Sequence, residues 1–180
     1  MFLKGFREAV RVATFVAIPY ILLNLAVLLR GLFEILRRPE LIDAWRFDLR
    51  EHGDTPALIL AAAVLFPKLA LGMSGFETGV SVMPHVAGDA SDAGAPRPRG
   101  RIRATRRLLL TAALIMSGLL LLSSFVTTLL VPVEAYSEGG EAAGRALAYL
   151  AHQYLGHAFG TAYDAATIAI LWFAGASAMV

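Results

Sequence analysis

The chain has no cysteine among its 180 residues, which excludes disulfide bonds, thiolate metal sites and a catalytic thiol. It also lacks any spacing of nucleophile and base that marks an enzyme, and any glycine-rich loop suited to a phosphate. None of His85, His152 and His157 has a second ligand at metal-binding spacing. The net charge of +2 gives no indication of nucleic acid. We therefore expect no enzymatic activity, no cofactor, no metal and no nucleic-acid partner.

Charged residues are scarce and unevenly placed. They make up 17% of the chain, hydrophobic residues make up 57%, and the mean hydropathy is +0.64. Val12–Leu29 contains 18 uncharged residues and Leu108–Val133 contains 26, whereas a membrane span needs about 20 apolar residues to cross roughly 30 Å of hydrocarbon. The sequence predicts an all-α integral membrane protein, a single membrane domain of residues 1–180 with four transmembrane helices at about residues 12–29, 56–86, 108–133 and 158–180.

Lysine and arginine are not shared equally among the connecting segments. The segment before the first predicted span and the connection Asp89–Arg107 carry more cations than anions, whereas the other two connections carry more anions. Cytoplasmic loops are enriched in Lys and Arg, so this alternation predicts a cytoplasmic N-terminus in the plasma (inner) membrane. The arginines of the Asp89–Arg107 connection are expected to meet anionic lipid headgroups.

The other two connections are predicted to hold amphipathic helices on the outer side, at about residues 31–50 and 142–156. The first is expected to break at Arg38-Pro39, with Glu34 one helical turn from Arg38, and Trp45 suits the headgroup layer. In the second, four residues recur at helical spacing and are expected to face the membrane: Leu147, Leu150, Tyr154 and Leu155.

The second predicted span is interrupted by Leu71–Gly79, which holds three glycines, two hydroxyls and the carboxylate of Glu77. Glycine costs a helix about 1 kcal/mol, and a carboxylate near the bilayer centre costs about 2.5–3.5 kcal/mol on insertion scales. Non-helical backbone survives at that depth only where it is buried in protein or lines a watery cavity. We therefore predict a helix broken around Ser74 and Gly75, with a substrate or ion site at the break.

A second interpretation of this segment stays open. Gly72, Gly75 and Gly79 would form a packing face for a neighbouring helix, with Glu77 hydrogen-bonded across it. Asn24, a polar residue in the first predicted span, is interpreted in the same way, as an interhelical hydrogen-bonding group in preference to a ligand.

The sequence Ser74-Gly75-Phe76-Glu77 resembles the Gly-Phe-Glu break in the sixth transmembrane helix of the amino acid–polyamine–organocation transporter superfamily. Pro96–Arg106 resembles that family's connection into the seventh helix, and Ala158–Asp164 would lead into the eighth. The resemblance covers nearly the whole chain. It implies that the four spans correspond to helices five to eight of a leucine-transporter-like inverted-repeat fold.

The resemblance also implies a site at the break. The carbonyl groups of Met73, Ser74 and Gly75 would contact the ammonium group of a substrate, and Phe76 would form a wall or lid. Glu77, in the first turn of the second half-helix, would act in proton coupling or gating.

The last predicted span would contribute Thr167 and Ser177 to a sodium site, as hydroxyls do in sodium-coupled relatives of this fold. The expected partners are an amino acid or similar small organic solute with proton or sodium coupling, membrane lipids, and the remaining helices of a full permease. The family's first and third helices and the end of its eighth have no counterpart here, so we expect a transporter fragment. A stand-alone four-helix assembly or regulatory protein and an inactive truncated permease are the alternatives.

Overall fold

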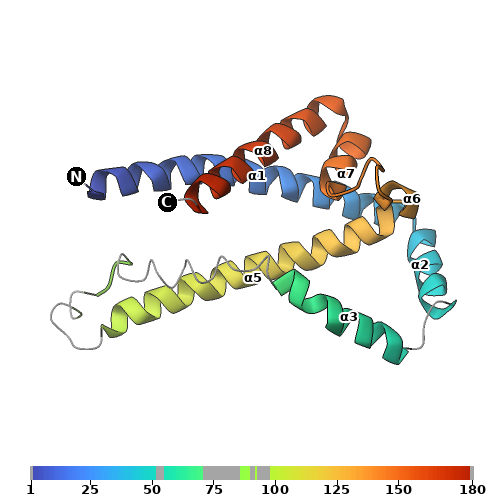
Figure 1. The fold of residues 1–180 in the computed structure, drawn as a ribbon, viewed down its shortest axis with the longest axis horizontal. Helices are drawn as coiled ribbons and strands as arrows, with labels where there is room; N and C mark the ends of the chain where they lie inside the picture. The colour runs from blue at the N-terminus through green and yellow to red at the C-terminus, as the bar shows by residue number, and fades with distance from the viewer. Residues whose placement is uncertain (1, 52–54, 71–85, 90–91, 93–97, 179–180) are drawn as a thin grey trace. The chain divides into compact units, whose positions relative to one another are not determined.

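The structure, a computed structural model, describes residues 2–51, 55–70, 86–89, 92 and 98–178. The expected all-α class is confirmed for these residues, although they form seven helices where four spans and two surface segments were expected (Figure 1). The helices are α1 (Phe2–Arg37), α2 (Glu40–Glu51), α3 (Thr55–Ala70), α5 (Arg99–Leu130), α6 (Val133–Tyr136), α7 (Ala146–Leu155) and α8 (His157–Ala178). They group into two compact units, one of Met1–Trp45 with Leu121–Val180 and one of Arg46–Leu120.

The first unit is built on α1, α7 and α8, which pack against one another (Figure 1). The chain turns from α7 into α8 at Gly156, whose φ of +88° is a backbone conformation that side-chain-bearing residues rarely adopt. Because of this turn, α7 folds back onto α8. The core between the elements is formed by apolar side chains, among them Val27, Leu28, Ile35, Val126, Leu130, Leu150, Ala151 and Tyr163.

Leu150 corrects one expectation from the sequence. It was expected to face the membrane, but it is only 1% exposed and belongs to the core of the first unit. The reason is that α7 packs against both α1 and α8, so its apolar stripe is covered by protein. Leu147, Tyr154 and Leu155 are half-buried.

The predicted break at Arg38-Pro39 is confirmed, since α1 ends at Arg37 and α2 begins at Glu40. Proline has no N–H to donate, and it disfavours helical backbone in the residue before it. The outer segment expected at residues 31–50 is divided between two helices. Its first part belongs to α1, which continues unbroken from the first predicted span to Arg37, and its second part forms α2. The α2 helix has no buried residue.

A close contact joins α1 to the end of α5 in the first unit. A methyl group placed on Gly31 would lie 2.5 Å from Cγ1 of Val126 and 3.2 Å from Cδ1 of Leu130. Glycine therefore sets the distance between these two apolar helices, as small residues do at helix contacts in membranes.

Two of the described helices are long and apolar enough to cross a membrane. They are Arg11–Arg37, with 27 residues and a mean hydropathy of 2.3, and Arg99–Leu130, with 32 residues and a mean hydropathy of 2.2. Only 17% of the first apolar window and 6% of the second is buried, and Phe15 and Leu121 are 78% and 71% exposed. A core helix of a soluble protein would bury such a surface. The spans predicted at residues 12–29 and 108–133 thus have matching helices.

The expected total of four spans is not reached within the described residues. The 16 residues of α3 cover about 24 Å, less than the hydrocarbon thickness of roughly 30 Å, and residues 71–85 of the same predicted span lie outside the described part of the chain. The α8 helix corresponds to the span predicted at residues 158–180. It is not among the helices that qualify by length and apolarity, and Tyr163 and Asp164 lie in its first two turns.

Asp92 fixes the start of α5 in the second unit. Its Oδ1 accepts a hydrogen bond from the backbone N–H of Gly100 at 3.0 Å. Its Oδ2 accepts from the N–H groups of Arg101 at 2.7 Å and Asp89 at 3.1 Å. These bonds, with that from Gly100 the strongest cause, hold the pKa of the Asp92 carboxyl below its usual value. Asp92 thereby satisfies two N–H groups of the first turn of α5, which have no partner within the helix.

Candidate functional site

A polar cluster joins α1 to α8 in the middle of apolar sequence. The hydroxyl of Tyr163 on α8 donates to Oδ1 of Asn24 on α1 at 2.9 Å. The Nδ2 group of Asn24 donates to the backbone carbonyl of Tyr20 at 2.8 Å. Asn24 is 9% exposed and Tyr163 is 3% exposed. The prediction that Asn24 is an interhelical hydrogen-bonding group is confirmed, and its partner on the other helix is Tyr163.

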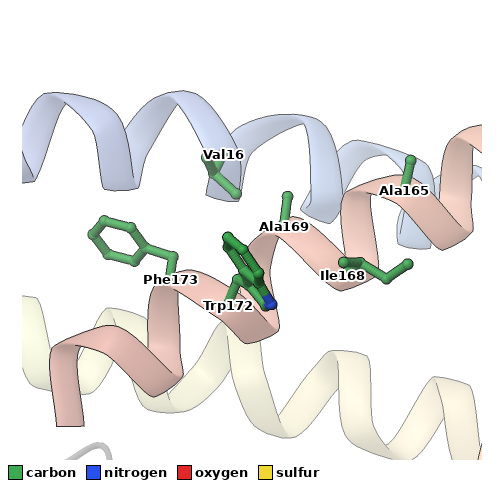
Figure 2. A pocket seen from close by; sticks show the side chains of 6 residues that line it. All are labelled: Val16, Ala165, Ile168, Ala169, Trp172 and Phe173. Carbon is green, nitrogen blue, oxygen red and sulfur yellow. The ribbon is translucent and has the colours of Figure 1, made fainter. Parts of the chain in front are cut away.

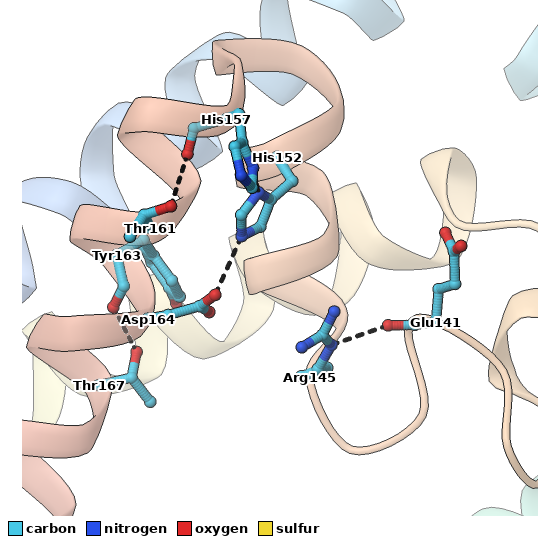
Figure 3. Close-up of polar contacts among 8 residues, drawn as sticks. All are labelled: Glu141, Arg145, His152, His157, Thr161, Tyr163, Asp164 and Thr167. Carbon is cyan, nitrogen blue, oxygen red and sulfur yellow. Dashed lines mark hydrogen bonds and ion pairs between the residues drawn. The ribbon is translucent and has the colours of Figure 1, made fainter.

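The cluster extends along both helices. The rings of Tyr20 and Tyr163 lie 6.2 Å apart at 41°, a tilted arrangement that aromatic pairs favour. One turn further along α8, the hydroxyl of Thr167 donates to the backbone carbonyl of Tyr163 at 2.9 Å (Figure 3). The donor of Thr167 is therefore in use, and only its oxygen lone pairs remain for a ligand.

A cavity of about 390 Å³ adjoins this cluster. It is lined by Tyr20, Tyr163 and Thr167 and by residues from the segment that leads into α7, including Gly144 and Arg145. Small-molecule sites in proteins have volumes of about 300–1,000 Å³, with a few polar groups set in apolar walls. The volume of this cavity lies within that range, and hydroxyl and apolar groups both line it.

A second hollow of about 520 Å³ lies between α1 and α8 (Figure 2). Val16 of α1 faces apolar residues of α8 across it, and Trp172 of α8 is 81% exposed. Its lining is formed by Val16, Ala165, Ile168, Ala169, Trp172 and Phe173. No side chain there offers a full charge to a solute, so the hydroxyl-bearing cavity is the better candidate for one.

The last turns of α1 carry a charged network. One carboxylate oxygen of Glu34 accepts from Arg30 at 2.8 Å, and the other lies 2.9 Å from the guanidinium of Arg38. The predicted pairing of Glu34 with Arg38 is therefore confirmed. The guanidinium of Arg30 also lies 5.7 Å from the ring centroid of Tyr154 on α7. This contact connects the charged end of α1 to α7.

Three titratable side chains meet where α7 turns into α8 (Figure 3). Nε2 of His152 lies 2.9 Å from Oδ2 of Asp164, and Nδ1 of His152 lies 3.2 Å from Nδ1 of His157. Within the described residues, no group of three or more His, Asp and Glu side chains is arranged to hold a metal ion.

No family model, no curated protein and no solved structure matches this chain. The resemblance to the amino acid–polyamine–organocation superfamily therefore stays a hypothesis based on its own residues.

Most of the predicted site lies outside the described residues. This applies to the proposed substrate contacts Met73, Ser74, Gly75 and Phe76 and to the coupling group Glu77. Their roles stay predictions.

The two residues predicted for a sodium site both lie on α8, a single helix over His157–Ala178. Thr167 and Ser177 are ten residues apart, which corresponds to about 15 Å along a helix that rises about 1.5 Å per residue. The side chain of Ser177 is outside the described part. The ion site stays a prediction, and at this separation one ion would contact one of the two hydroxyls and not both.

The contact between His152, His157 and Asp164 was not predicted from the sequence, and neither was the role of Tyr163. The available signal was Gly156, a helix-ending residue between two helical patterns, which allows His152 to turn back toward residues that follow it. Nothing in the local sequence around Tyr163 identifies Asn24, 139 positions away, as its partner.

Proposed function

We propose that this chain is part of a secondary active transporter for amino acids or related small organic solutes. The observation that carries the proposal is the buried Asn24–Tyr163 hydrogen bond beside a 390 Å³ cavity, set among apolar helices. Buried polar side chains hydrogen-bond across helices in membrane proteins, and polar and ionisable groups at membrane depth are costly and mark solute or ion pathways. The two long, exposed apolar helices support a membrane location for this arrangement.

In this proposal the helix break at Leu71–Gly79 binds the solute. Carbonyl groups of Met73, Ser74 and Gly75 accept hydrogen bonds from its ammonium group, as unwound backbone does in discontinuous transporter helices. Phe76 walls the site, and Glu77 takes up and releases a proton as the hydration of the site changes. The supporting evidence is the sequence Ser74-Gly75-Phe76-Glu77 and its resemblance to the superfamily.

The polar cluster has a different role in the same proposal. Asn24 and Tyr163 hold α8 against α1, and Thr167 offers its oxygen to the adjoining cavity. A fixed contact of this kind keeps the two helices together while other parts of a transporter rearrange between outward- and inward-facing states. The orientation proposed with it has the N-terminus in the cytoplasm of the plasma (inner) membrane, and the protein carries out no covalent chemistry.

Exchange and accumulation in proteoliposomes test the proposal. We expect the reconstituted protein to exchange internal unlabelled for external radiolabelled amino acid faster than protein-free liposomes do. An imposed pH gradient should drive accumulation. Glu77→Gln removes the titratable proton and should impair accumulation more than exchange, because exchange requires no net proton movement.

Glu138→Gln is the matched control, because Glu138 is an exposed carboxylate in the segment between α6 and α7. It should behave like the wild type in both assays. Wild-type exchange no faster than that of protein-free liposomes would contradict transport by this chain and favour the alternatives, an assembly or regulatory protein or an inactive truncated permease. Accumulation by Glu77→Gln at the wild-type rate would remove Glu77 from the coupling step.

A further inference from the structure

The His152 side chain is held on both of its ring nitrogens. Nε2 meets the carboxylate of Asp164 at 2.9 Å and Nδ1 meets Nδ1 of His157 at 3.2 Å (Figure 3). The ring lies directly on the backbone of α8, because a methyl group added to Gly160 would overlap it. The side chain of His152 is 26% exposed and that of Asp164 is 36% exposed, so protons from water reach the cluster.

These contacts restrict where protons can sit. An ionised carboxylate only accepts hydrogen bonds, so Nε2 of His152 carries a proton and donates it to Asp164. A hydrogen bond between the two Nδ1 atoms needs one proton and one lone pair. It therefore forms whenever at most one of the two histidines is charged. His157 is the donor when both are neutral or when His157 alone is charged, and His152 is the donor when His152 alone is charged.

The bond cannot form when both histidines are charged. Each Nδ1 then carries a proton, and the two N–H groups point at one another across 3.2 Å. Two positive charges also repel, with ring centroids 5.2 Å apart. Histidine is the side chain that ordinarily changes charge between about pH 5 and 8.

We propose that His152, His157 and Asp164 form a proton-binding site that acts as a latch between α7 and α8. The latch is closed while at most one of the two histidines is charged, and it opens when both are charged. The end of α7 then separates from the start of α8, at the Gly156 turn, whereas the Asn24–Tyr163 bond further along α8 is unaffected. This proposal stands independently of the transport function.

Several other charged and titratable groups on or beside the packed helices have contacts of their own. On α1, Glu34 pairs with Arg30 and Arg38. On α7, the guanidinium of Arg30 lies over the ring of Tyr154. Besides His152 and Tyr154, the titratable group on α7 is Tyr149. On α8, the hydroxyl of Tyr163 is bonded to Asn24. Before α7, Nε of Arg145 donates to the carbonyl of Glu141 at 3.0 Å. Asp164 is therefore the counter-charge that the geometry assigns to the histidine pair.

A distance measurement between two spin labels tests the latch in the full chain. The chain has no cysteine, so Gln153→Cys on α7 and Ala162→Cys on α8, both at exposed positions, give two defined labels. We expect a narrow distance distribution at pH 7.5 and a longer, broader one at pH 5. His157→Gln retains a hydrogen-bonding group without gaining a charge, so it should keep the narrow distribution at both pH values.

Thr161→Val is the matched control. It removes a neighbouring hydroxyl, which donates to the backbone carbonyl of His157 at 2.9 Å, and leaves both imidazoles in place, so the pH response should persist. An unchanged wild-type distribution between pH 7.5 and pH 5 would overturn the proposal. A response of His157→Gln equal to that of the wild type would also overturn it, since other groups would then be responsible.

Nuclear magnetic resonance of the wild type tests the same site without any variant. In protein with ¹⁵N-labelled histidine, the shared proton should give a coupling between Nδ1 of His152 and Nδ1 of His157 at neutral pH. We expect this coupling to disappear in the same pH range as the change in label distance. Absence of the coupling at every pH would contradict the proposal.

Discussion

The hydrogen bond between Tyr163 and Asn24 allows a quantitative prediction. Tyr163→Phe removes the hydroxyl that donates to Asn24 at 2.9 Å and leaves Oδ1 of Asn24 without this donor in a site where the two residues are 3% and 9% exposed. Interhelical hydrogen bonds in membranes contribute about 0.6 kcal/mol on average and at most about 1.7 kcal/mol. Because both groups are buried, we expect a loss of about 1–1.7 kcal/mol in the free energy of unfolding.

A double-mutant cycle isolates this bond from other effects of the substitutions. Asn24→Ala also removes the bond from Nδ2 to the carbonyl of Tyr20, so it should cost more than Tyr163→Phe alone. The coupling energy between the two substitutions should be about 1 kcal/mol. The free energy of unfolding of the wild type, the two single variants and the double variant is measured in mixed detergent micelles by circular dichroism.

The control cycle replaces Tyr163→Phe by Tyr149→Phe. Tyr149 lies on α7, and the hydrogen-bond partners of the Asn24 side chain are Tyr20 and Tyr163, so the coupling of Tyr149→Phe to Asn24→Ala should be close to zero. A Tyr163–Asn24 coupling below about 0.3 kcal/mol, within the usual scatter of additive substitutions, would refute the inference that this bond holds α8 to α1.

Two further predictions concern helix packing and pH. Gly31→Ala should lower the free energy of unfolding by about 1–3 kcal/mol, because the added methyl group overpacks against Val126. Gly118→Ala, with nothing within 4 Å of the added methyl group, should leave the free energy of unfolding unchanged or raise it by up to about 1 kcal/mol. Equal effects of the two substitutions in the same unfolding assay would contradict the close approach of the helices at Gly31. Because the pKa of Asp92 is lowered in the folded state, its contribution to stability is present above its ordinary value of 3.8 and is lost as the pH falls through the lowered value. Helix content measured between about pH 5 and pH 2 should therefore fall more in the wild type than in Asp92→Asn, and identical curves would argue against the cap on α5.

Features set by local sequence were predictable. Pro39 ends α1 because a proline restricts its own backbone and that of the residue before it, and no distant contact alters this. The interhelical role of Asn24 followed from the cost of an unpaired amide in an apolar helix. Its partner did not, because the fold alone brings together residues 139 positions apart.

Two failures have physical causes of the same kind. Leu150 was expected at the lipid surface. Lipid and protein core are both apolar, so helical periodicity identifies the apolar face of a helix but not whether lipid or protein covers it. His152 and His157 were given no ligand partner because their contact with Asp164 exists only once α7 has folded back at Gly156. Met73 through Glu77, outside the described residues, stay predictions drawn from sequence.

Equilibrium binding of radiolabelled amino acids to the purified protein tests the central claim most directly. The transport proposal predicts saturable binding of at least one amino acid. It also predicts that Gly75→Leu, which puts a large side chain at the proposed break, abolishes binding, whereas Gly118→Leu, at a position with nothing within 4 Å of an added methyl group, retains it. No saturable binding by the wild type across a full panel of amino acids, or binding by Gly75→Leu equal to that of the wild type, would contradict the account.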